Sequence, residues 1–402
     1  MAGCGTGVGN AIRFVYLDNS KDKSAISIGS NMEKSNIRPQ LIFKTDLVVI
    51  GAGQAGLSSA YHLKKLGLKM GRDFVVLDQA AHPGGAWQYR WPSLTLSTVN
   101  GIHDLPGLSF RETVSAEPTQ EVRANVAVPR YFECYEKTFG LTVYRPVSVR
   151  VVCEREGSLR IETDRGFFSA KGIINATGTW DKPYIPEYPG ATIFKGQQLH
   201  TKDYQMASVF KNKHVLIVGG GISAIQLLDE ISQITRTSWV TRRPPIFEEG
   251  PFDAERGRTA VAIVEDRVRR GLPAGSVVSV TGLPVTPAIV AMRERGVLNR
   301  RPMFTELTEA GVRWADGSSL QVDVILWCTG FRSSLDHLMP LMLRGKDGGI
   351  VMGGRLATMV TIDPRIHLVG YGPSASTIGA NRAGRAAAQE LTEYLKLKKE
   401  FN

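Results

Sequence analysis

Two stretches of the chain share one pattern of hydrophobic and polar positions. Each opens with a short run of β-branched and other apolar residues, DLVVI at 46–50 and HVLIV at 214–218. Uninterrupted apolar runs of this length are typical of parallel strands whose two faces are both buried. Each run leads into a glycine-rich turn, then into a segment with apolar residues on one helical face, then into another short apolar run. The pattern therefore predicts two βαβ units.

The remaining segments predict further strands and two more helices. Strands are expected within residues 141–156, 158–178, 311–330 and 365–372. A helical pattern covers TAVAIVEDRVRR at 259–270, and Gly271 and Pro273 are typical of the end of a helix. Another helical pattern covers 381–399. Residues 1–44 are polar without sustained periodicity, so we expect them to be disordered or packed on the surface.

Length and composition indicate a globular protein with two domains. The chain has 402 residues, of which 43% are hydrophobic and 22% are charged. No apolar run is long enough to span a membrane, and nothing near the start resembles a signal peptide, so a cytoplasmic protein is expected. Its cysteines (Cys4, Cys134, Cys153, Cys328) are too scattered for a disulfide framework or a Cys-x-x-Cys pair. No metal site is predicted.

The net charge of +11 does not indicate a nucleic-acid partner. A nucleic-acid binder concentrates its basic residues in a patch with stacking aromatics. Here the arginines between Arg242 and Arg301 are spread among seven acidic residues, and no nucleic-acid motif is present. We interpret the excess as surface charge that also attracts the phosphates of a cofactor.

The first glycine-rich turn has the spacing of a dinucleotide site. Gly51, Gly53 and Gly56 permit, in order, the tight turn, the approach of a pyrophosphate and the close packing of helix on strand. The helix N-terminus then offers free N–H groups to the phosphates. Asp78 ends the next strand, where it can accept hydrogen bonds from a ribose diol. An acid at this position disfavours a 2′-phosphate, so FAD or NAD is expected here.

The second glycine-rich turn has the same spacing, but the strand that follows it ends in different residues. Gly219, Gly221 and Ala224 occupy the three positions, with Ala tolerated at the packing position. The following strand ends in Arg242 and Arg243 instead of an acid, and two guanidinium groups there suit a 2′-phosphate. This loop is therefore expected to bind NADPH. A chain with both sites suggests a flavin that receives hydride from NADPH.

The segment between the two units carries a family motif. Phe194, Gly196, His200 and Tyr204 match the pattern Phe-x-Gly-x-x-x-His-x-x-x-aromatic. On this motif the sequence resembles the flavin-containing monooxygenases, FAD- and NADPH-dependent enzymes related to the Baeyer–Villiger and YUCCA monooxygenases. The resemblance covers nearly everything from 45 to 395. It implies an α/β fold with two Rossmann-like domains, the NADP domain inserted in the FAD domain.

Four further segments are similar to motifs of that family. PGGAW at 83–87 resembles its FAD motif, and NATGTW at 175–180 and WCTGF at 327–331 resemble its paired hinges. HLVGYG at 367–372, with the segment that follows it, resembles the C-terminal return beside the flavin. Together with the glycine loops, the resemblance implies cofactor contacts by Gln54, Ala55, Gln79, Gly85, Ala86, Trp87, Thr98, Val149, Ala176, Thr177, Gly178, Ile222, Ser223, Cys328, Thr329, Gly330, Tyr371, Gly372, Thr377 and Ile378.

The resemblance also implies a division of the chain. It assigns residues 45–192 and 330–402 to the FAD-binding domain, 205–329 to the NADPH-binding domain with an insertion at 244–305, and 193–204 to the linker motif. By analogy with the family, a homodimer is one possible oligomeric state.

Several positions depart from the family pattern. Ser97 stands where many members carry an asparagine at the active site. Gln205 follows the aromatic residue of the linker, Cys328 replaces an alanine of the second hinge, and Pro373 replaces an aspartate. We treat Ser97, His200 and Tyr204 as candidate catalytic residues. For His200 the alternative is a structural role that holds the linker backbone.

The family resemblance implies a reaction in which the protein supplies neither a nucleophile nor an acid–base pair. In the implied reaction NADPH reduces FAD, O2 forms a C4a-hydroperoxyflavin, and one oxygen passes to a nitrogen or sulfur centre or to a ketone. Trp87 and Trp91 are expected either to line the substrate pocket or to belong to the core. Two alternatives stay open: a reductase or oxidase that passes electrons to a small acceptor, and a flavoprotein sensor without turnover.

Overall fold

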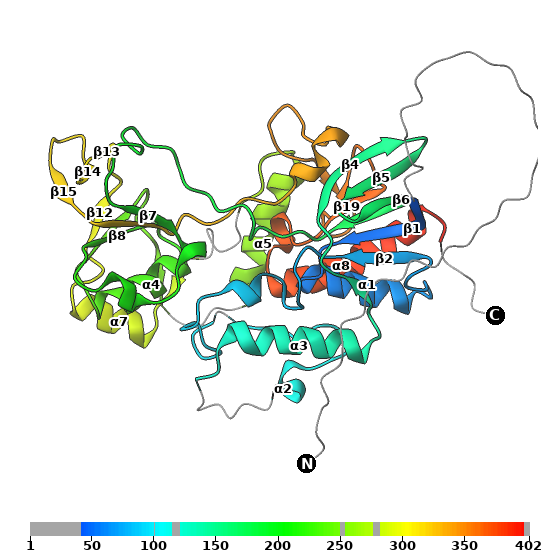
Figure 1. The fold of residues 1–402 in the computed structure, drawn as a ribbon, viewed down its shortest axis with the longest axis horizontal. Helices are drawn as coiled ribbons and strands as arrows, with labels where there is room; N and C mark the ends of the chain where they lie inside the picture. The colour runs from blue at the N-terminus through cyan, green and yellow to red at the C-terminus, as the bar shows by residue number, and fades with distance from the viewer. Residues whose placement is uncertain (1–41, 100, 115–120, 250–253, 276–281, 398–402) are drawn as a thin grey trace, which may run out of the picture. The chain divides into compact units, whose positions relative to one another are not determined.

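The computed structural model describes residues 42–99, 101–114, 121–249, 254–275 and 282–397 (Figure 1). These residues belong to one compact unit that spans 41–402. Of the extension predicted for 1–44, residues 1–41 lie outside the described part. The boundary at 44 is wrong, because residues 42–44 already belong to the first strand. Among the described residues, no helix combines the length and the apolar character needed to cross a membrane.

The first sheet has nine strands, ordered β17-β18-β19-β6-β1-β2-β3, with β5 pairing both β6 and β4. Its strands are β1 (Ile42–Ile50), β2 (Phe74–Leu77), β3 (Val143–Tyr144), β4 (Val149–Arg155), β5 (Ser158–Thr163), β6 (Gly166–Asn175), β17 (Met352–Gly353), β18 (Met359–Val360) and β19 (Ile366–Leu368). The pairs β1–β2, β1–β6, β2–β3 and β6–β19 are parallel, as the buried apolar runs predict.

Both faces of this sheet are covered. Leu47 and Val49 of β1 face one core, and Val48 and Ile50 face the other. The helices α1 (Gln54–Lys65), α3 (Ala124–Thr138) and α8 (Thr377–Tyr394) supply the first core, and Figure 1 shows α1 and α8 side by side along the sheet. The two helices approach so closely that a Cβ at Gly384 would lie 2.8 Å from the Oγ of Ser58.

The second sheet has five parallel strands, ordered β12-β9-β8-β16-β7. They are β7 (Gln197–His200), β8 (Val215–Val218), β9 (Thr237–Thr241), β12 (Arg300–Pro302) and β16 (Val324–Trp327). The period of two recurs in β8, because Val215 and Ile217 face one core while Leu216 and Val218 face the other. The helices α4 (Ile222–Ser232) and α7 (Pro287–Glu294) contribute to the first of these cores.

Smaller elements complete the described residues. They are α2 (Phe110–Thr113), α5 (Ala254–Arg269), β10 (Phe247–Glu248), β11 (Leu283–Pro284), β13 (Glu306–Thr308), β14 (Gly311–Arg313), β15 (Ser319–Gln321), and the 3₁₀ helices η1 (Gly85–Tyr89), η2 (Thr201–Asp203), η3 (Ala207–Phe210), η4 (Asp336–Leu341) and η5 (Gly372–Ser374). The α5 helix confirms the prediction at 259–270, and Gly271 follows it with a φ of +70°.

Two element boundaries differ from the sequence prediction. The C-terminal helix starts at Thr377 and not at 381, because Ser376 caps it by accepting the Gly379 N–H at 3.1 Å. The predicted linker at 193–204 contains β7, which pairs with β16 from Gln197↔Val324 to His200↔Trp327. This segment lacks the long apolar run that signals a buried strand, since β7 is an edge strand with half-buried side chains.

Residues 91–99 tie the first glycine-loop region to α4. Ser93 Oγ donates to Glu230 at 2.7 Å, and Gln226 Nε2 donates to the carbonyl of Thr98 at 2.8 Å. Trp91 and Leu94 are buried in the same core as α4. The segment therefore forms part of the second core although it precedes the second unit in the sequence by more than a hundred residues.

Two buried histidines, His337 and His367, contact residues of the first sheet or next to it and are neutral. His337 Nε2 donates to Asn175 Oδ1 at 2.7 Å, and His367 lies 3.1 Å from the Thr358 hydroxyl with its Nε2 unpartnered among the described residues. Burial lowers the pKa of each from 6.5 to about 4. Below pH 6.5 the unfolded chain binds protons that the folded chain does not, so stability falls as the pH falls towards 4.

We expect His337→Gln to flatten this acid dependence. Between pH 6.5 and 4 the variant should lose less free energy of unfolding than the parent protein, by roughly 1–3 kcal/mol. Urea unfolding followed by tryptophan fluorescence at several pH values measures the difference. The exposed His82 offers the matched control His82→Gln, and equal slopes for all three proteins would contradict the prediction.

Candidate cofactor and active site

The first glycine loop has the packing and the open space that a pyrophosphate requires. Gly51 has a φ of +99°, and a Cβ there would lie 2.5 Å from the carbonyl oxygen of Ala176. A Cβ at Gly56 would lie 1.9 Å from the carbonyl oxygen of Gly51. Around Gly53, in contrast, no described residue other than its chain neighbours has a heavy atom within 4 Å of the Cβ position. Two glycines therefore serve internal packing, and the middle one leaves room for a ligand.

The N-terminus of α1 opens beside this loop. Gly53 is its N-cap residue, no side chain caps the helix, and its first turn holds no acidic residue. The η1 helix of the PGGAW motif lies against the loop, because a Cβ at Gly85 would be 3.0 Å from the Cα of Gly53. The predicted FAD residues Gln54, Ala55, Gly85, Ala86 and Trp87 therefore come from two segments that meet at the loop. This arrangement fits an anionic cofactor.

Asp78 bridges the same loop from the end of β2. Its carboxylate accepts the N–H of Ala52 at 2.6 Å and the N–H of Ala80 at 2.8 Å. The residue is 8% exposed, so its carboxylate has little access to solvent. Next to it, the amide of Gln79 donates to Asp181, which lies just after the first hinge. The predicted ribose contact by Asp78 stays a prediction.

The second glycine loop repeats the geometry of the first. Gly219 has a φ of +135°, and a Cβ there would lie 2.2 Å from the carbonyl oxygen of Cys328. No heavy atom lies within 4 Å of the Cβ position at Gly221, and Ala224 is fully buried. The first turn of α4, which includes Ile222 and Ser223, carries no acidic residue. The loop thus fits a second pyrophosphate.

The arginine pair lies at the end of β9, next to this loop. Arg242 and Arg243 are both exposed, and among the described residues neither guanidinium group has a hydrogen bond or an ion pair. Arg300 lies near them, since its Nη1 donates to the carbonyl and the hydroxyl of Thr241 at 3.1 and 3.0 Å. Positive charge therefore collects where the adenosine end of a dinucleotide would lie.

The linker motif fastens β7 to the second hinge. His200 is 1% exposed, its Nδ1 accepts the Lys202 N–H at 3.1 Å, and its Nε2 donates to the carbonyl of Gly330 at 2.9 Å. Burial lowers its pKa, so the ring is neutral. Because both ring nitrogens are engaged with backbone, the geometry favours the structural alternative for His200. Gly196 is required by packing, since a Cβ there would lie 2.3 Å from the ring of Phe194.

The other two candidate catalytic residues lie in different environments. Tyr204 is 1% exposed and packs against Trp91 and Phe210, and burial, followed by the nearby Glu230, raises its pKa. Its ring and that of Trp91 thus belong to the core. Ser97 is exposed, and its hydroxyl lies 2.7 Å from that of Thr95. Ser97 is the one of the three that a substrate could contact.

The two hinges are held by a chain of hydrogen bonds. Asn175 Nδ2 donates to the hydroxyl of Thr177 at 3.0 Å, and that hydroxyl donates to the carbonyl of Ser334 at 2.6 Å. At Gly178 and Gly330, no heavy atom lies within 4 Å of the Cβ position. Burial raises the pKa of the Cys328 thiol to about 12, so this thiol stays protonated. The hinges therefore offer open backbone without reactive side chains.

The C-terminal return brings α8 to the first loop. Gln54 Nε2 donates to Asn381 Oδ1 at 2.9 Å, and Gly370 would place a Cβ 3.7 Å from that of Ala55. Thr377 and Ile378 form the first turn of α8, and Ile378 is 49% exposed. Tyr371 is buried, and Gly372 has a φ of +54°. The predicted contacts at Val149, Thr98, Thr329 and these residues remain predictions.

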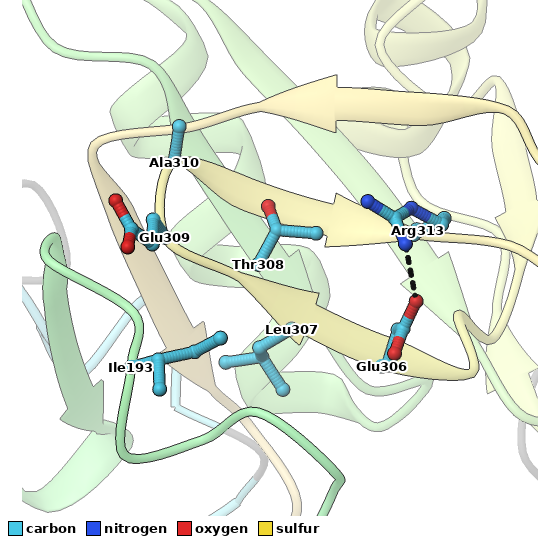
Figure 2. A pocket seen from close by; sticks show the side chains of 7 residues that line it. All are labelled: Ile193, Glu306, Leu307, Thr308, Glu309, Ala310 and Arg313. Atoms are coloured by element: carbon cyan, nitrogen blue, oxygen red, sulfur yellow. Dashed lines mark hydrogen bonds and ion pairs between the residues drawn. The ribbon is translucent and has the colours of Figure 1, made fainter.

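A surface pocket of about 390 Å³ lies elsewhere, on the β13–β14 hairpin (Figure 2). Figure 2 shows Glu306 and Arg313 on adjacent strands with their side chains paired. Arg313 Nη1 lies 2.9 Å from Glu306 Oε1. The lining residues are Ile193, Glu306, Leu307, Thr308, Glu309, Ala310 and Arg313. None of them belongs to a glycine loop or a hinge, so this pocket is separate from the candidate site. Nor do three His, Cys, Asp or Glu side chains in the described part of the chain converge as a metal site.

Comparison with known proteins gives the family. The model of the pyridine nucleotide-disulphide oxidoreductase family matches residues 48–266. The solved structure of a flavin-containing monooxygenase from Stenotrophomonas maltophilia is 33% identical, with a TM-score of 0.73 over 88% of this chain and 100% of that chain. This chain belongs to the flavin-containing monooxygenases. It is accordingly an oxidoreductase of a family that uses FAD and NADPH.

More distant relatives of this flavin monooxygenase come from bacteria and plants. The uncharacterized oxidoreductase CzcO of Bacillus velezensis is 26% identical over 76% of this chain and 87% of its own length. The indole-3-pyruvate monooxygenase YUCCA1 of Oryza sativa subsp. japonica is 26% identical over 72% of this chain and 77% of its own length. The family resemblance and the doubly Rossmann-like fold predicted from the sequence are thereby confirmed.

Sequence reasoning missed two residues beside the site of this monooxygenase. Arg90 follows η1 and lies over the rings of Trp87 and Trp180, at 5.9 and 4.9 Å from the ring centroids. The two missed residues are Arg90 and Trp180. The arginine between two tryptophans in AWQYRW was the available signal for Arg90, and Trp180 is the last residue of the first hinge motif, NATGTW. Nothing in the local sequence indicates that these segments meet.

The contrast between the loop glycines predicts two different defects. Gly56→Ala should lower the free energy of unfolding by at least about 2 kcal/mol, because its Cβ would clash with backbone. Gly53→Ala should leave that stability nearly unchanged, since Gly53 has a φ of −77° and free space around it. It should instead weaken FAD binding by about 10-fold or more. Thermal unfolding of the apoprotein and titration with FAD separate the two effects, and loss of stability in Gly53→Ala would contradict this account.

Proposed function

We propose that this protein is an FAD- and NADPH-dependent monooxygenase that transfers one oxygen atom from O2 to a small molecule at a nitrogen or sulfur centre or a ketone. The observation that carries the proposal is the repeated loop geometry. Each loop has a middle glycine facing open space, and each has a turn glycine packed on a hinge that leads to the other sheet. Two dinucleotides bound at these loops would each lie beside a hinge that leads to the other sheet, which suits hydride transfer between them.

The residues present fit both cofactors. The loop Gly51–Gly56, with the α1 N-terminus and η1, would hold the FAD pyrophosphate, and the loop at Gly219–Gly221 with Arg242 and Arg243 would hold NADPH. When bound, FAD supplies the redox chemistry, accepting hydride from NADPH and activating O2. The chain itself has to bind, orient and exclude water, since side reactions with water compete with oxygen transfer.

The side chains around the hinges support that division of work. His200 is neutral and bound to backbone on both ring nitrogens, and the Cys328 thiol is buried and protonated. Neither is available as a general base or nucleophile. The aromatic rings of Trp180 and Phe331 stack on each other instead, at a centroid distance of 5.2 Å, and so place apolar surface at the two hinges. The state of Cys328, and the absence of a Cys-x-x-Cys pair from the sequence, also disfavour a reductase that passes electrons through a reactive thiol pair.

The arginine pair is the proposed basis for NADPH selectivity. In the double variant Arg242→Gln, Arg243→Gln, the KM for NADPH should rise about 10–100-fold, because charge-assisted bonds to the 2′-phosphate are lost. The KM for NADH should stay within about 2-fold, as NADH lacks that phosphate. Arg313→Gln on the distant hairpin is the matched control and should change neither value. An equal rise for both nucleotides would assign the pair to the shared phosphates instead.

Oxygen transfer itself is tested with isotopically labelled gas. FAD-loaded protein is given NADPH, oxygen-18 gas and a panel of sulfides, amines and ketones, and products are analysed by mass spectrometry. We expect one labelled oxygen atom in the product for each NADPH consumed in its formation. NADPH oxidation that yields only hydrogen peroxide or a reduced acceptor with the whole panel would support the oxidase or reductase alternative.

A further inference from the structure

Arg90 is fixed in an aromatic enclosure beside the proposed site. Its backbone N–H donates to the carbonyl of Trp87 at 3.1 Å, and its own carbonyl accepts from Asn125 Nδ2 at 3.0 Å. Its guanidinium carbon lies 4.9 Å from the ring centroid of Trp180 and 5.9 Å from that of Trp87. The backbone anchors and the two rings thus define where this cation is held.

The described residues provide no anionic partner for this cation. Among the described residues, its guanidinium group makes neither a hydrogen bond nor an ion pair, whereas Arg145 binds both oxygens of Glu136 at 2.7 Å. The nearest acid in sequence to Trp180 is Asp181, which already accepts from Gln79 and lies 3.8 Å from the Nζ of Lys202. Burial lowers the pKa of Arg90 to about 10, which leaves the group charged at neutral pH.

Aromatic faces interact with the positive charge of an arginine but not with its N–H donors. A ring face attracts the positive charge, but the five N–H donors of the guanidinium group point outward in its own plane. An oxyanion such as a carboxylate matches this planar fork with two parallel hydrogen bonds. The enclosure therefore lacks the one component, an in-plane anion, that would compensate the partial desolvation of Arg90.

The enclosure lies where the proposed cofactor segments meet. Trp87 belongs to η1, which packs on the first glycine loop, and Trp180 is the last residue of the first hinge motif. Phe331 of the second hinge stacks on Trp180 at 5.2 Å, and the ring of His200 meets Phe331 edge-on at 4.8 Å. Lys202 adds a second positive charge, 5.9 Å from the ring of Trp180. Beside them Tyr89, 47% exposed, stacks on Trp180 at 6.1 Å.

We propose that Arg90 is a substrate-binding residue that pairs with a carboxylate, so that this monooxygenase acts on organic acids with an aromatic or other flat apolar portion. The exposed face of Tyr89 packs against that portion, and Lys202 adds long-range attraction for the anion. The substrate assignment rests on the function proposed above, whereas the anion site itself does not depend on turnover.

The test compares acids with their neutral esters. Binding of (phenylthio)acetate and phenylpyruvate, and of their methyl esters, is measured by calorimetry on the FAD-loaded protein. We expect each acid to bind more tightly than its ester. Arg90→Gln should weaken binding of the acids about 10–100-fold and of the esters less than about 2-fold. Arg90→Lys, which keeps the charge without the planar fork, should show an intermediate loss.

A matched control shows whether acid binding depends on Arg90 itself or on the loss of any exposed positive charge. Arg332 lies over the ring of Tyr184 at 4.0 Å from its centroid and is exposed, so Arg332→Gln removes a stacked arginine outside the enclosure. It should leave binding of the acids unchanged. FAD occupancy and thermal unfolding of each variant show whether it is folded. Equal binding of acid and ester by the parent protein, or undetectable binding of both acids, would overturn the proposal.

A phosphate of NADPH is the other oxyanion that could reach Arg90. Anaerobic reduction of the flavin is therefore followed at increasing NADPH concentration in the parent protein and in Arg90→Gln. If the NADPH concentration that gives half-maximal reduction is the same in both proteins, the result supports pairing of Arg90 with a substrate carboxylate. A rise of about 10-fold or more in the variant, with acids and esters equally affected, assigns Arg90 to the nucleotide and overturns the proposal. Arg90-dependent acid binding without labelled product would sustain the anion site while refuting the proposed monooxygenase reaction.

Discussion

The structure depends on one close approach that occurs twice, between a turn glycine and a hinge carbonyl. Gly51 leaves no room for a Cβ beside the carbonyl of Ala176, and Gly219 leaves none beside that of Cys328. In each case the hinge residue also donates its N–H to the last residue of the first strand, at 2.7 Å to Ile50 and 2.8 Å to Val218. Each phosphate loop is thus fastened to the point where the chain leaves its own sheet for the other.

This fastening explains why the protein needs little chemistry of its own. Because both loops are packed against hinges, the positions of two bound dinucleotides would be set by backbone geometry, which side-chain motion cannot easily alter. Two titratable groups near the hinges are accordingly withdrawn from reaction, because His200 is bonded to the backbone and Cys328 is buried. Among the described residues near the hinges, we assign substrate contacts to the aromatic surface, the exposed hydroxyl of Ser97 and the half-buried cation of Arg90.

The local elements and the fold class could be predicted from the sequence, whereas the meeting of distant segments could not. Runs such as DLVVI and HVLIV predict buried strands because their last four residues are all apolar, and the two glycine spacings identify the turns that follow. The strand β7 was missed because an edge strand is only half buried and carries no such run. The enclosure of Arg90 was missed because its rings come from segments about ninety residues apart, which no local pattern relates.

The placement of β7 has a consequence for how the second sheet is protected from other chains. Its hydrogen bonds cover the open edge of β16, so the segment before residue 205 shields a strand that is apolar along its whole length. A fragment cut at the apparent domain boundary would expose the N–H and C=O groups of Val324–Trp327 as a template for intermolecular pairing. The family motif at 194–204 is therefore also a safeguard against aggregation, and the nucleotide-binding half is complete only when that segment is included.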